Sequence, residues 1–202
     1  MNINYFITII VLLFLFSCLF NIGSVTGYFV YLGEGKCDCN SCSDCIDALN
    51  DPNCNIVYLT NDIIDYSETC INNPENFSNK IFDCRGNLID GSFALESSGI
   101  YLENKTNATI KNCSIKNFYF AGILLNNTNL SNIIFNNISD NGIHIPGRGY
   151  SISIFNSSHN IIENNYIYNT TDAGIINTLS SNNNIIANNN ISYSGDFGIY
   201  IG

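Results

Sequence analysis

Apolar residues alternate with polar or small residues along short runs in the second half of the chain. Ile100 and Leu102 form one such pair, and Ile123 and Leu125 form the next. A period of two is typical of β-strands, because successive side chains of a strand point to opposite faces. No helical periodicity is sustained in this region. The pattern therefore predicts many short strands.

Two signatures recur along the same region. One is the pair Gly-Ile, and the other is an Asn-rich segment that ends in isoleucine. The isoleucines of the Asn-rich signature are 23, 29 and 24 residues apart, which is the period of a stacked solenoid. The Gly-Ile pairs begin at Gly99, Gly122, Gly142, Gly174 and Gly198, and the Asn-rich segments end at Ile115, Ile138, Ile167 and Ile191.

Short strands joined by tight Gly or Asn corners cannot close a barrel at this period, but each coil can hydrogen-bond to the next. Parallel crossovers are overwhelmingly right-handed. Residues 56–202 are therefore predicted to form an all-β fold, a right-handed single-stranded parallel β-helix of about five coils. Two isoleucine files should form its core: Ile89, Ile115, Ile138, Ile167 and Ile191, and Ile100, Ile123, Ile143, Ile175 and Ile199.

Asparagine recurs two residues before the first isoleucine file. We interpret this register as an asparagine ladder at a corner of the coil. Asparagine accepts left-handed backbone, and its amide can donate to one neighbouring coil while accepting from the other. Cys113 interrupts the ladder, which consists of Asn87, Asn136, Asn165 and Asn189.

The segment Ile81–Gly91, read together with the Gly-Ile pairs that follow it, resembles the pectin-lyase-like right-handed β-helix proteins of microbial cell surfaces. The resemblance covers residues 56–202. Members of this family include carbohydrate-binding and sugar-hydrolase repeat domains and a periplasmic copper-handling protein. The resemblance implies the fold, whereas the repeat motif encodes the scaffold and no particular chemistry.

The N-terminal region has the features of an export signal. Tyr5–Phe20 is an almost unbroken apolar run, shorter than a comfortable membrane span, and small and polar residues follow it. We predict a signal peptide over residues 1–27 with cleavage near Gly27, hence a secreted or cell-surface protein. Because basic residues are lacking before the run, an uncleaved anchor extending through Leu32 is one alternative, and a lipoprotein box at Cys18 is another.

Eight cysteines follow the predicted signal, mostly in a Cys-rich segment over residues 28–55. An even number of cysteines in an exported chain suggests disulfides, and these would staple a cap over the first coil of the solenoid. A zinc or iron–sulfur site is the alternative for the clustered thiols. Cys84 could pair with Cys113 or with Cys70. The disulfide candidates are Cys37, Cys39, Cys42, Cys45, Cys54, Cys70, Cys84 and Cys113.

The chain carries a net charge of −10, which argues against nucleic acid as a partner. Asp140, Asp172 and Asp196 each stand two residues before the glycine of a coil, so we expect a column of three carboxylates. Like charges at the inter-strand spacing call for a shared proton or a bound cation such as Ca²⁺. The alternative is turn capping at a solvated corner, and no other cofactor is predicted.

The coil that begins at Gly142 is irregular, since 32 residues separate Gly142 from Gly174. Insertions in a solenoid become loops, and loops often carry function. If the protein is an enzyme, Asp140, His144 and Arg148 are the catalytic candidates, because a lyase needs a base and a group that neutralises the substrate carboxylate. The paired-aspartate and His-Gly motifs of related polysaccharide hydrolases are not evident.

An apolar and aromatic stripe is expected on the outside of the Gly-Ile strands. Such a stripe suits the stacking of sugar rings or packing against another protein. A loop or the N-terminal segment that covers the stripe is the alternative. The predicted binding residues are Tyr101, Leu124, His144, Ile176 and Tyr200.

These features favour an exported, non-enzymatic scaffold of the cell envelope that binds carbohydrate or another surface protein. A lyase or hydrolase acting on an acidic polysaccharide is the alternative, and a copper protein is disfavoured by the scarcity of methionine and histidine. Asn156 and Asn169 are the best glycosylation candidates among the sequons. The last strand, which begins at Gly198, lacks a cap in the sequence, so we expect self-association there or a longer solenoid.

Overall fold

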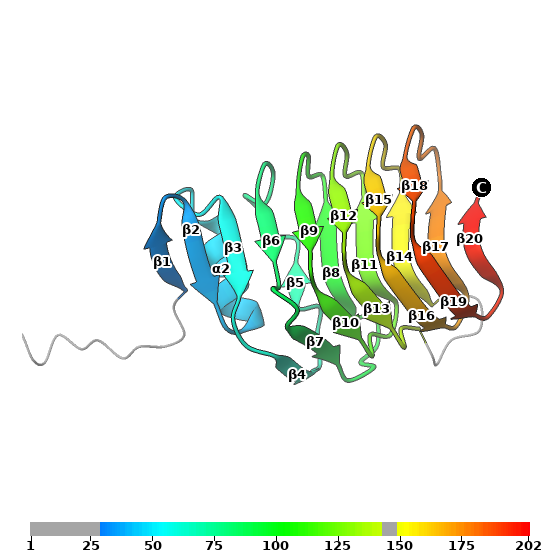
Figure 1. Ribbon diagram of the computed structural model, residues 1–202, viewed down its shortest axis with the longest axis horizontal. Helices are drawn as coiled ribbons and strands as arrows, with labels where there is room; N and C mark the ends of the chain where they lie inside the picture. The colour runs from blue at the N-terminus through cyan, green and yellow to red at the C-terminus, as the bar shows by residue number, and fades with distance from the viewer. Residues whose placement is uncertain (1–28, 143–148) are drawn as a thin grey trace, which may run out of the picture.

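The chain forms a parallel β-solenoid with a cap at its N-terminal end. The computed structural model describes residues 29–142 and 149–202. Coils stack along the long axis of the molecule from β1 to β20, and the single described helix, α2, lies beside β2 and β3 (Figure 1). The predicted signal peptide lies outside the described residues, as does most of the alternative anchor. Within the described ranges, no helix has the length and apolarity needed to cross a membrane.

Three sheets run the length of the described solenoid, and each coil contributes one strand to each sheet. Sheet A contains β1 (Val30–Gly33), β2 (Lys36–Cys39), β3 (Ile56–Leu59), β6 (Ile81–Asp83), β9 (Thr109–Lys111), β12 (Asn132–Ile134), β15 (Ile161–Glu163) and β18 (Ile185–Ala187). Sheet B contains β4 (Ile63–Tyr66), β7 (Leu88–Gly91), β10 (Ser114–Lys116), β13 (Asn137–Ser139), β16 (Tyr166–Thr170) and β19 (Asn190–Ser194). Sheet C contains β5 (Ile71–Asn72), β8 (Ser98–Glu103), β11 (Ala121–Asn126), β14 (Tyr150–Phe155), β17 (Ala173–Thr178) and β20 (Phe197–Ile201).

The fold class is as predicted, although the described solenoid is longer than five coils. Six three-stranded coils run from β3–β5 to β18–β20, and β2 begins a further turn by pairing in parallel with β3. The Gly-Ile count missed the first coil, because Cys70 rather than glycine precedes Ile71 there.

Stacked isoleucines fill the core, as expected. The first file pairs Ile89, Ile115, Ile138, Ile167 and Ile191 through sheet B. A third file, which the repeat signatures did not reveal, runs through sheet A as Val57, Phe82, Ile110, Ile133 and Ile162. The side chains of this third file are fully buried. Apolar burial on three faces makes each coil depend on its neighbours, because a single coil encloses no core of its own.

The second file differs from the prediction at one coil. Ile152, not Ile143, lies between Ile123 and Ile175 in sheet C. The reason is that Gly142 and Gly149 lie against each other, so closely that neither has room for a Cβ atom, and the coil resumes only after Gly149. The Gly-Ile pair at Gly142 therefore matches the repeat in sequence, but it does not occupy the repeat position in sheet C, which Ser151 and Ile152 take.

The repeated glycines mark a crowded corner between sheets B and C. A Cβ atom on Gly122 would lie 2.5 Å from Cγ2 of Ile138 and 2.9 Å from the carbonyl oxygen of Ser151. Gly122 has an ordinary backbone conformation, so the absence of a side chain and not a left-handed φ is what the corner requires. In the irregular coil this position is taken by Ser151, whose hydroxyl lies 2.6 Å from that of Thr170.

The asparagine ladder is present at the corner between sheets A and B. Asn165 Nδ2 donates to the carbonyl oxygen of Ile133 at 2.8 Å and to Asn189 Oδ1 at 2.9 Å. Its Oδ1 accepts from both the backbone N–H and the side chain of Asn136, each at 3.0 Å. Asn87 holds the ladder position in an earlier coil and donates to the carbonyl oxygen of Leu59. The ladder thus joins coils through buried amides.

One detail of the ladder was predicted wrongly. The left-handed residue is not the ladder asparagine but the residue before it, as Phe135, Asn164 and Asn188 show with φ of 57°, 56° and 53°. This turn directs the next side chain inward. The ladder side chain can therefore reach both a carbonyl oxygen and an N–H of the preceding coil, as Asn165 does at Ile133 and Asn136.

Two further ladders, not expected from the sequence, stand at the corner between sheets C and A. In the first, Ser131 N–H donates to Asn160 Oδ1 at 2.9 Å, and Asn160 N–H donates to Asn184 Oδ1 at 2.8 Å. In the second, hydroxyls replace amides: Lys105 N–H donates to Thr128 at 3.4 Å, and Thr128 N–H donates to Ser157 at 2.9 Å. Mixed residue types hide these ladders from an asparagine count.

The N-terminal cap combines a hairpin, a short helix and disulfides. β1 pairs antiparallel with β2. Ser41 is the N-cap of α2 (Cys42–Asn50), and its side chain accepts from the N–H of Asp44. Lys80 Nζ donates to the carbonyl oxygens of Leu49 and Asp51 near the end of the helix. All eight predicted cysteines form disulfides, which excludes the metal-thiolate alternative for this state: Cys37–Cys54, Cys39–Cys45, Cys42–Cys70 and Cys84–Cys113.

Candidate functional site

The outer face of sheet C carries the predicted stripe, with one change. The register aligns Tyr101, Leu124, Ile176 and Tyr200 in one outward row, as expected. The fifth position belongs to Ser153, which pairs with Leu124 and Ile176, and not to residue 144. Because of the insertion, the sheet C strand of this coil begins at Tyr150 and not near Gly142. The prediction that His144 pairs with Leu124 and Ile176 was therefore wrong. His144 itself lies outside the described residues.

A second row of side chains runs beside the stripe and was missed by the sequence reasoning. It contains Ala121, Tyr150, Ala173 and Phe197 at paired positions. Ala121, Tyr150 and Ala173 pack together, apart from the main core, with Phe120, Leu124 and Ile176 against them. The rings of Phe120 and Tyr150 meet edge to face with their centroids 5.8 Å apart. The strict alternation of a strand fails here because the chain bends at the corner glycine.

Two hollows lie along this face. The first has a volume of about 430 Å³, and Tyr101, Phe120, Leu124 and Phe155 contribute its apolar walls, with Asn126 beside them. The second has a volume of about 410 Å³ and is lined by Tyr150, Asp172, Ala173, Ile176, Phe197 and Tyr200. Phe120 lines the first hollow and touches Tyr150 of the second. We call the two hollows together the sheet C groove.

Asp172 brings a buried carboxyl group to the second hollow. Burial raises the pKa of Asp172, a hydrogen bond from the hydroxyl of Tyr150 opposes this change, and the carboxyl of Asp196 raises the pKa further through its charge and a hydrogen bond. The N–H of Asp196 donates to the carbonyl oxygen of Asp172 at 2.9 Å. The charge of Asp196 therefore disfavours ionisation of Asp172.

Replacing Asp172 with asparagine tests the strain in this pair. A raised pKa means that the folded protein keeps a proton that the unfolded chain has already released, so stability falls as pH rises from the unfolded pKa through the folded one. Asp172→Asn retains an acceptor for Tyr150 without the charge. We expect a higher melting temperature than the native protein at neutral pH and a smaller difference in acid. Lower stability of the variant at neutral pH would contradict repulsion within the pair.

Asp140 does not join this pair, so the predicted column of three carboxylates is wrong. Asp140 has a left-handed φ of 55° at the corner between sheets B and C, where its Oδ1 accepts from Asn169 Nδ2 at 2.7 Å. The extra residues between Gly142 and Gly149 shift the register, so Asp172 stacks on Gly149 instead. Among the described residues, no group of three His, Cys, Asp or Glu side chains could hold a metal ion. Ca²⁺ binding therefore has no supporting geometry there.

The proposed catalytic set of Asp140, His144 and Arg148 is not brought together by the described residues. Asp140 is bonded to Asn169, while His144 and Arg148 lie outside the described ranges. The same hydrogen bond occupies the amide of Asn169, one of the two glycosylation candidates. Asn156, the other candidate, is exposed, and no side-chain hydrogen bond is described for it. Its modification stays a prediction.

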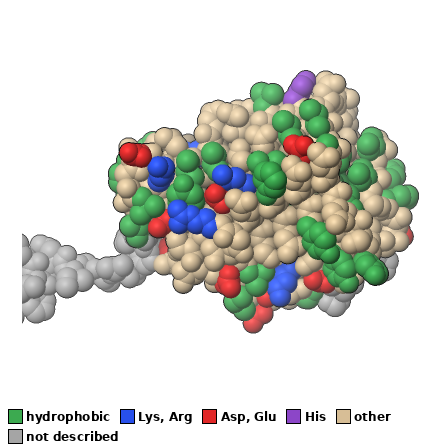
Figure 2. Space-filling view, viewed as in Figure 1, with side chains coloured by type: hydrophobic (Ala, Val, Ile, Leu, Met, Phe, Trp, Pro, Cys, Tyr) green, Lys and Arg blue, Asp and Glu red, His purple; other side chains and the backbone are tan. Residues whose placement is uncertain are grey.

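Basic side chains are concentrated in the N-terminal half of the described structure. Every described lysine and arginine lies at or before Lys116. On the face shown in Figure 2, the Lys and Arg side chains lie between the N-terminal end and about the middle of the molecule, and none lies toward the C-terminal end. Neither hollow of the sheet C groove is lined by a described lysine or arginine. The groove therefore lies in an acidic and apolar setting.

Another hollow, of about 590 Å³, is at the corner between sheets A and B, where Arg85, Asn112, Cys113 and Phe135 contribute to its walls. Its charged group and its cysteine already have partners, since Cys113 is in a disulfide with Cys84. The guanidinium of Arg85 lies 3.6 Å from the ring centre of Tyr58 and 3.6 Å from Asp38 Oδ1. We regard this corner as structural.

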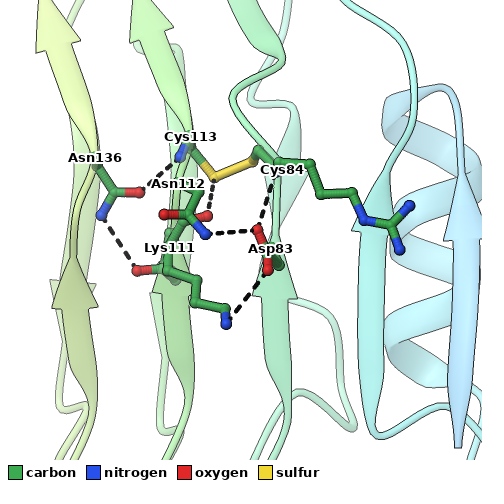
Figure 3. Close-up of polar contacts among 8 residues, drawn as sticks. Asp83, Cys84, Lys111, Asn112, Cys113 and Asn136 are labelled. Atoms are coloured by element: carbon green, nitrogen blue, oxygen red, sulfur yellow. Dashed lines mark hydrogen bonds and ion pairs between the residues drawn. A yellow bond between two sulfur atoms is a disulfide. The ribbon is translucent and has the colours of Figure 1, made fainter.

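The corner shows how ion pairs and a disulfide join two coils (Figure 3). Cys84 is bonded to Cys113 across the coils, and Lys111 Nζ lies 3.3 Å from Asp83 Oδ2. Burial acts to raise the pKa of Asp83, but hydrogen bonds from Asn112 and from the N–H of Arg85, with the charge of Lys111, hold that pKa below its ordinary value. The carboxylate therefore stays ionised as part of an inter-coil brace.

Comparison with known proteins supports the fold. A family model described as "Right handed beta helix region" matches residues 78–202. Among curated proteins, none matches the chain. A solved structure, that of an alginate lyase from Paenibacillus sp. str. FPU-7, is similar with a TM-score of 0.60 and 16% sequence identity, covering 82% of this chain and 64% of the lyase. At that identity the likeness concerns the fold, and the chain spans less than two thirds of the lyase. Because the family model matches well over half of the sequence, the chain belongs to the right-handed β-helix family.

Proposed function

We propose that this protein binds a polysaccharide along the sheet C groove and acts as an extended scaffold rather than as a catalyst. The observation that carries the proposal is that the two hollows lie on the same face of sheet C and that aromatic and aliphatic side chains of their walls pack against one another. Aromatic faces in a groove suit the apolar faces of sugar rings. Asn126 and Ser98 in the first hollow can hydrogen-bond sugar hydroxyls.

The length of the groove suits a polymer better than a single sugar. The row from Tyr101 to Tyr200 crosses five adjacent strands of sheet C. Four inter-strand steps of about 4.8 Å give roughly 19 Å of surface. Several sugar residues can therefore contact the row at once, and weak contacts add along it.

We also propose that the protein works outside the reducing interior of the cell, as a secreted or surface protein. The predicted signal at residues 1–27 supports this location, and so do the four disulfides, because disulfides persist mainly in oxidising compartments. Carbohydrates of an envelope or of the surroundings are then available as ligands. Another surface protein lying on the same face is the competing partner.

Removing single aromatic side chains tests the groove. We expect Tyr101→Ala and Tyr200→Ala each to weaken binding to the best ligand on a glycan array by roughly three- to tenfold, since each removes one stacking surface. Tyr166→Ala is the matched control, because Tyr166 is a similarly exposed tyrosine on sheet B. Equal losses for all three variants, or none, would contradict binding in the groove. Calorimetric titration with the ligand found gives the affinities.

Catalysis by a lyase or hydrolase is the second candidate. It is favoured by the contact of the Tyr150 hydroxyl with the buried carboxyl of Asp172, since such a pair can exchange protons with a substrate. Assays for reducing ends and for unsaturated products separate it from the scaffold. Turnover that is abolished in Tyr150→Phe would replace the scaffold proposal, whereas turnover that survives replacement of His144 and Arg148 would exclude those two residues as catalysts.

A further inference from the structure

We propose that the sheet C groove selects glycans whose sugars carry free amino groups, and that it rejects uronic-acid polymers. This inference rests on the proposed function and assigns a class of ligand to the same groove. An ammonium group of the glycan would lie in the second hollow between Asp172, Asp196 and Tyr150, while neighbouring sugars lie on the aromatic floor.

The ionisable groups of the groove set its charge preference. Glu96 lines the first hollow, Glu103 lies on the same face and bonds the side chain of Asn126, and Asp172 lines the second hollow with Asp196 at its side. All of these groups are carboxyls. A uronate polymer would bring a carboxylate on every sugar toward them, with no described cation in the groove to compensate.

The described basic side chains are engaged elsewhere. Four of them pair with carboxylates outside the groove, and Lys80 donates to carbonyls at the end of α2. Lys105 is buried at the corner between sheets C and A. The four pairs are Lys36–Glu34, Arg85–Asp38, Lys111–Asp83 and Lys116–Asp90. The five cations with partners cannot turn toward a ligand in the groove without losing them, and Lys105, for which no ammonium partner is described, lines neither hollow.

The second hollow suits an ammonium group in geometry as well as in charge. Asp172 is 9% exposed and lies next to Asp196 of the following coil. Within the described structure, neither carboxyl group takes part in an ion pair with a lysine or arginine. An ammonium has three N–H donors, which match two carboxylates and one hydroxyl. It would also offset the repulsion between the carboxyl groups of Asp172 and Asp196. The rings of Phe197 and Tyr200 line the same hollow and can attract a cation through their faces.

A buried hydroxyl at the junction of the hollows supports a polar ligand there. Ser153 lies on the outer face of sheet C between Leu124, which lines the first hollow, and Ile176, which lines the second. It is fully buried, and its Oγ has no hydrogen-bond partner in the described structure. Buried hydroxyls nearly always have partners. Ser153 lines neither hollow in this structure, so a sugar hydroxyl or amine at the junction would supply a partner once the side chains that cover Ser153 move aside.

Calorimetric titration with oligosaccharides of equal length tests the charge preference. The probes are a glucosamine oligomer, its fully N-acetylated form and a galacturonate oligomer, at a pH where the glucosamine amines are protonated. We expect the glucosamine oligomer to bind at least about tenfold more tightly than the acetylated one, since it gains charge-assisted hydrogen bonds, and the galacturonate oligomer not to bind. Tighter binding of either other probe would overturn the inference but leave the groove proposal intact. Binding of none of the probes would overturn the inference, and the glycan array would then decide the groove proposal separately.

Variants with equal changes in net charge separate a local site from general attraction to an acidic protein. Asp172→Asn with Asp196→Asn removes the pair, and Asp140→Asn with Glu163→Gln removes two carboxylates that bond Asn169 and Asn188 away from the groove. The first double variant should lose the preference for glucosamine over its acetylated form, and the second should keep it. Equal losses in both variants would mean attraction to the net charge of −10 and would overturn the inference.

Discussion

Replacing Asn165 with leucine should lower the stability of the protein by about 3 to 5 kcal/mol, because two buried backbone groups of the preceding coil lose their partner at roughly 1 to 3 kcal/mol each. The side chain of Asn165 is 1% exposed. It donates to the carbonyl oxygen of Ile133 and to Oδ1 of Asn189. It accepts from the backbone N–H and the side-chain amide of Asn136. Leucine fills the volume but replaces none of these bonds. A drop in melting temperature of roughly 8 to 15 °C is expected for a chain of this size.

Asn137→Leu is the matched control for that experiment. Asn137 is exposed on β13, and no side-chain hydrogen bond is described for it, although it follows a ladder residue directly in the sequence. The control should change stability by no more than about 0.5 kcal/mol. If the two variants melt at the same temperature, the ladder does not stabilise the solenoid.

The second large effect concerns the disulfide between Cys42 and Cys70. This bond ties α2 to the first coil across 28 residues, whereas Cys39–Cys45 closes a separation of 6 residues. Loop-closure entropy predicts a loss of about 3.5 kcal/mol for the double alanine variant of the long link and about 2 kcal/mol for that of the short one. Unfolding in urea under oxidising conditions measures both.

The comparison between these links is informative because all four cysteines are buried to a similar degree. The packing lost with each sulfur is therefore alike, and the difference between the variants reports the constraint. The long link also fixes the cap on the open end of the core, so its loss should increase the binding of an apolar dye. A smaller effect from the long link than from the short one would show that α2 is held mainly by its link to β2 through Cys39–Cys45 and not by its link to the first coil.

The sequence predicts the solenoid well because every coil repeats the same physical solution. A file such as Ile115, Ile138 and Ile167 is visible as soon as the period is found, since each coil needs an apolar side chain at that point. The asparagine ladder is visible for the same reason. The ladders at the corner between sheets C and A were not predicted, because serine, threonine and asparagine alternate at their positions. Ser131 and Asn160 are an example.

The candidate site was harder to predict because it depends on where the repeat is broken. Two Gly-Ile-like positions compete in the irregular coil, and only the contact between Gly142 and Gly149 shows which strand enters the sheet. That contact moves Ser153 into the stripe and separates Asp140 from Asp172. Tyr150 was overlooked because it follows the insertion directly, at a bend where inward and outward no longer alternate. The spacing of residues in the sequence reveals neither the contact between the two glycines nor the bend at Tyr150.

The ladders also bear on how this architecture can change in size. Each ladder residue offers the same donor and the same acceptor to the coil behind it. Asn160 donates to the carbonyl oxygen of Thr128 and accepts from the N–H of Ser131, and Asn184 donates to the carbonyl oxygen of Ser157 and accepts from the N–H of Asn160. Every junction between regular coils is therefore chemically equivalent. Duplication or loss of one whole coil leaves matching surfaces to rejoin, while the gain or loss of a few residues is tolerated only outside the strands. The groove would then lengthen by one strand of sheet C for each added coil. The length of the ligand-binding face would therefore be set by the number of repeats in the sequence.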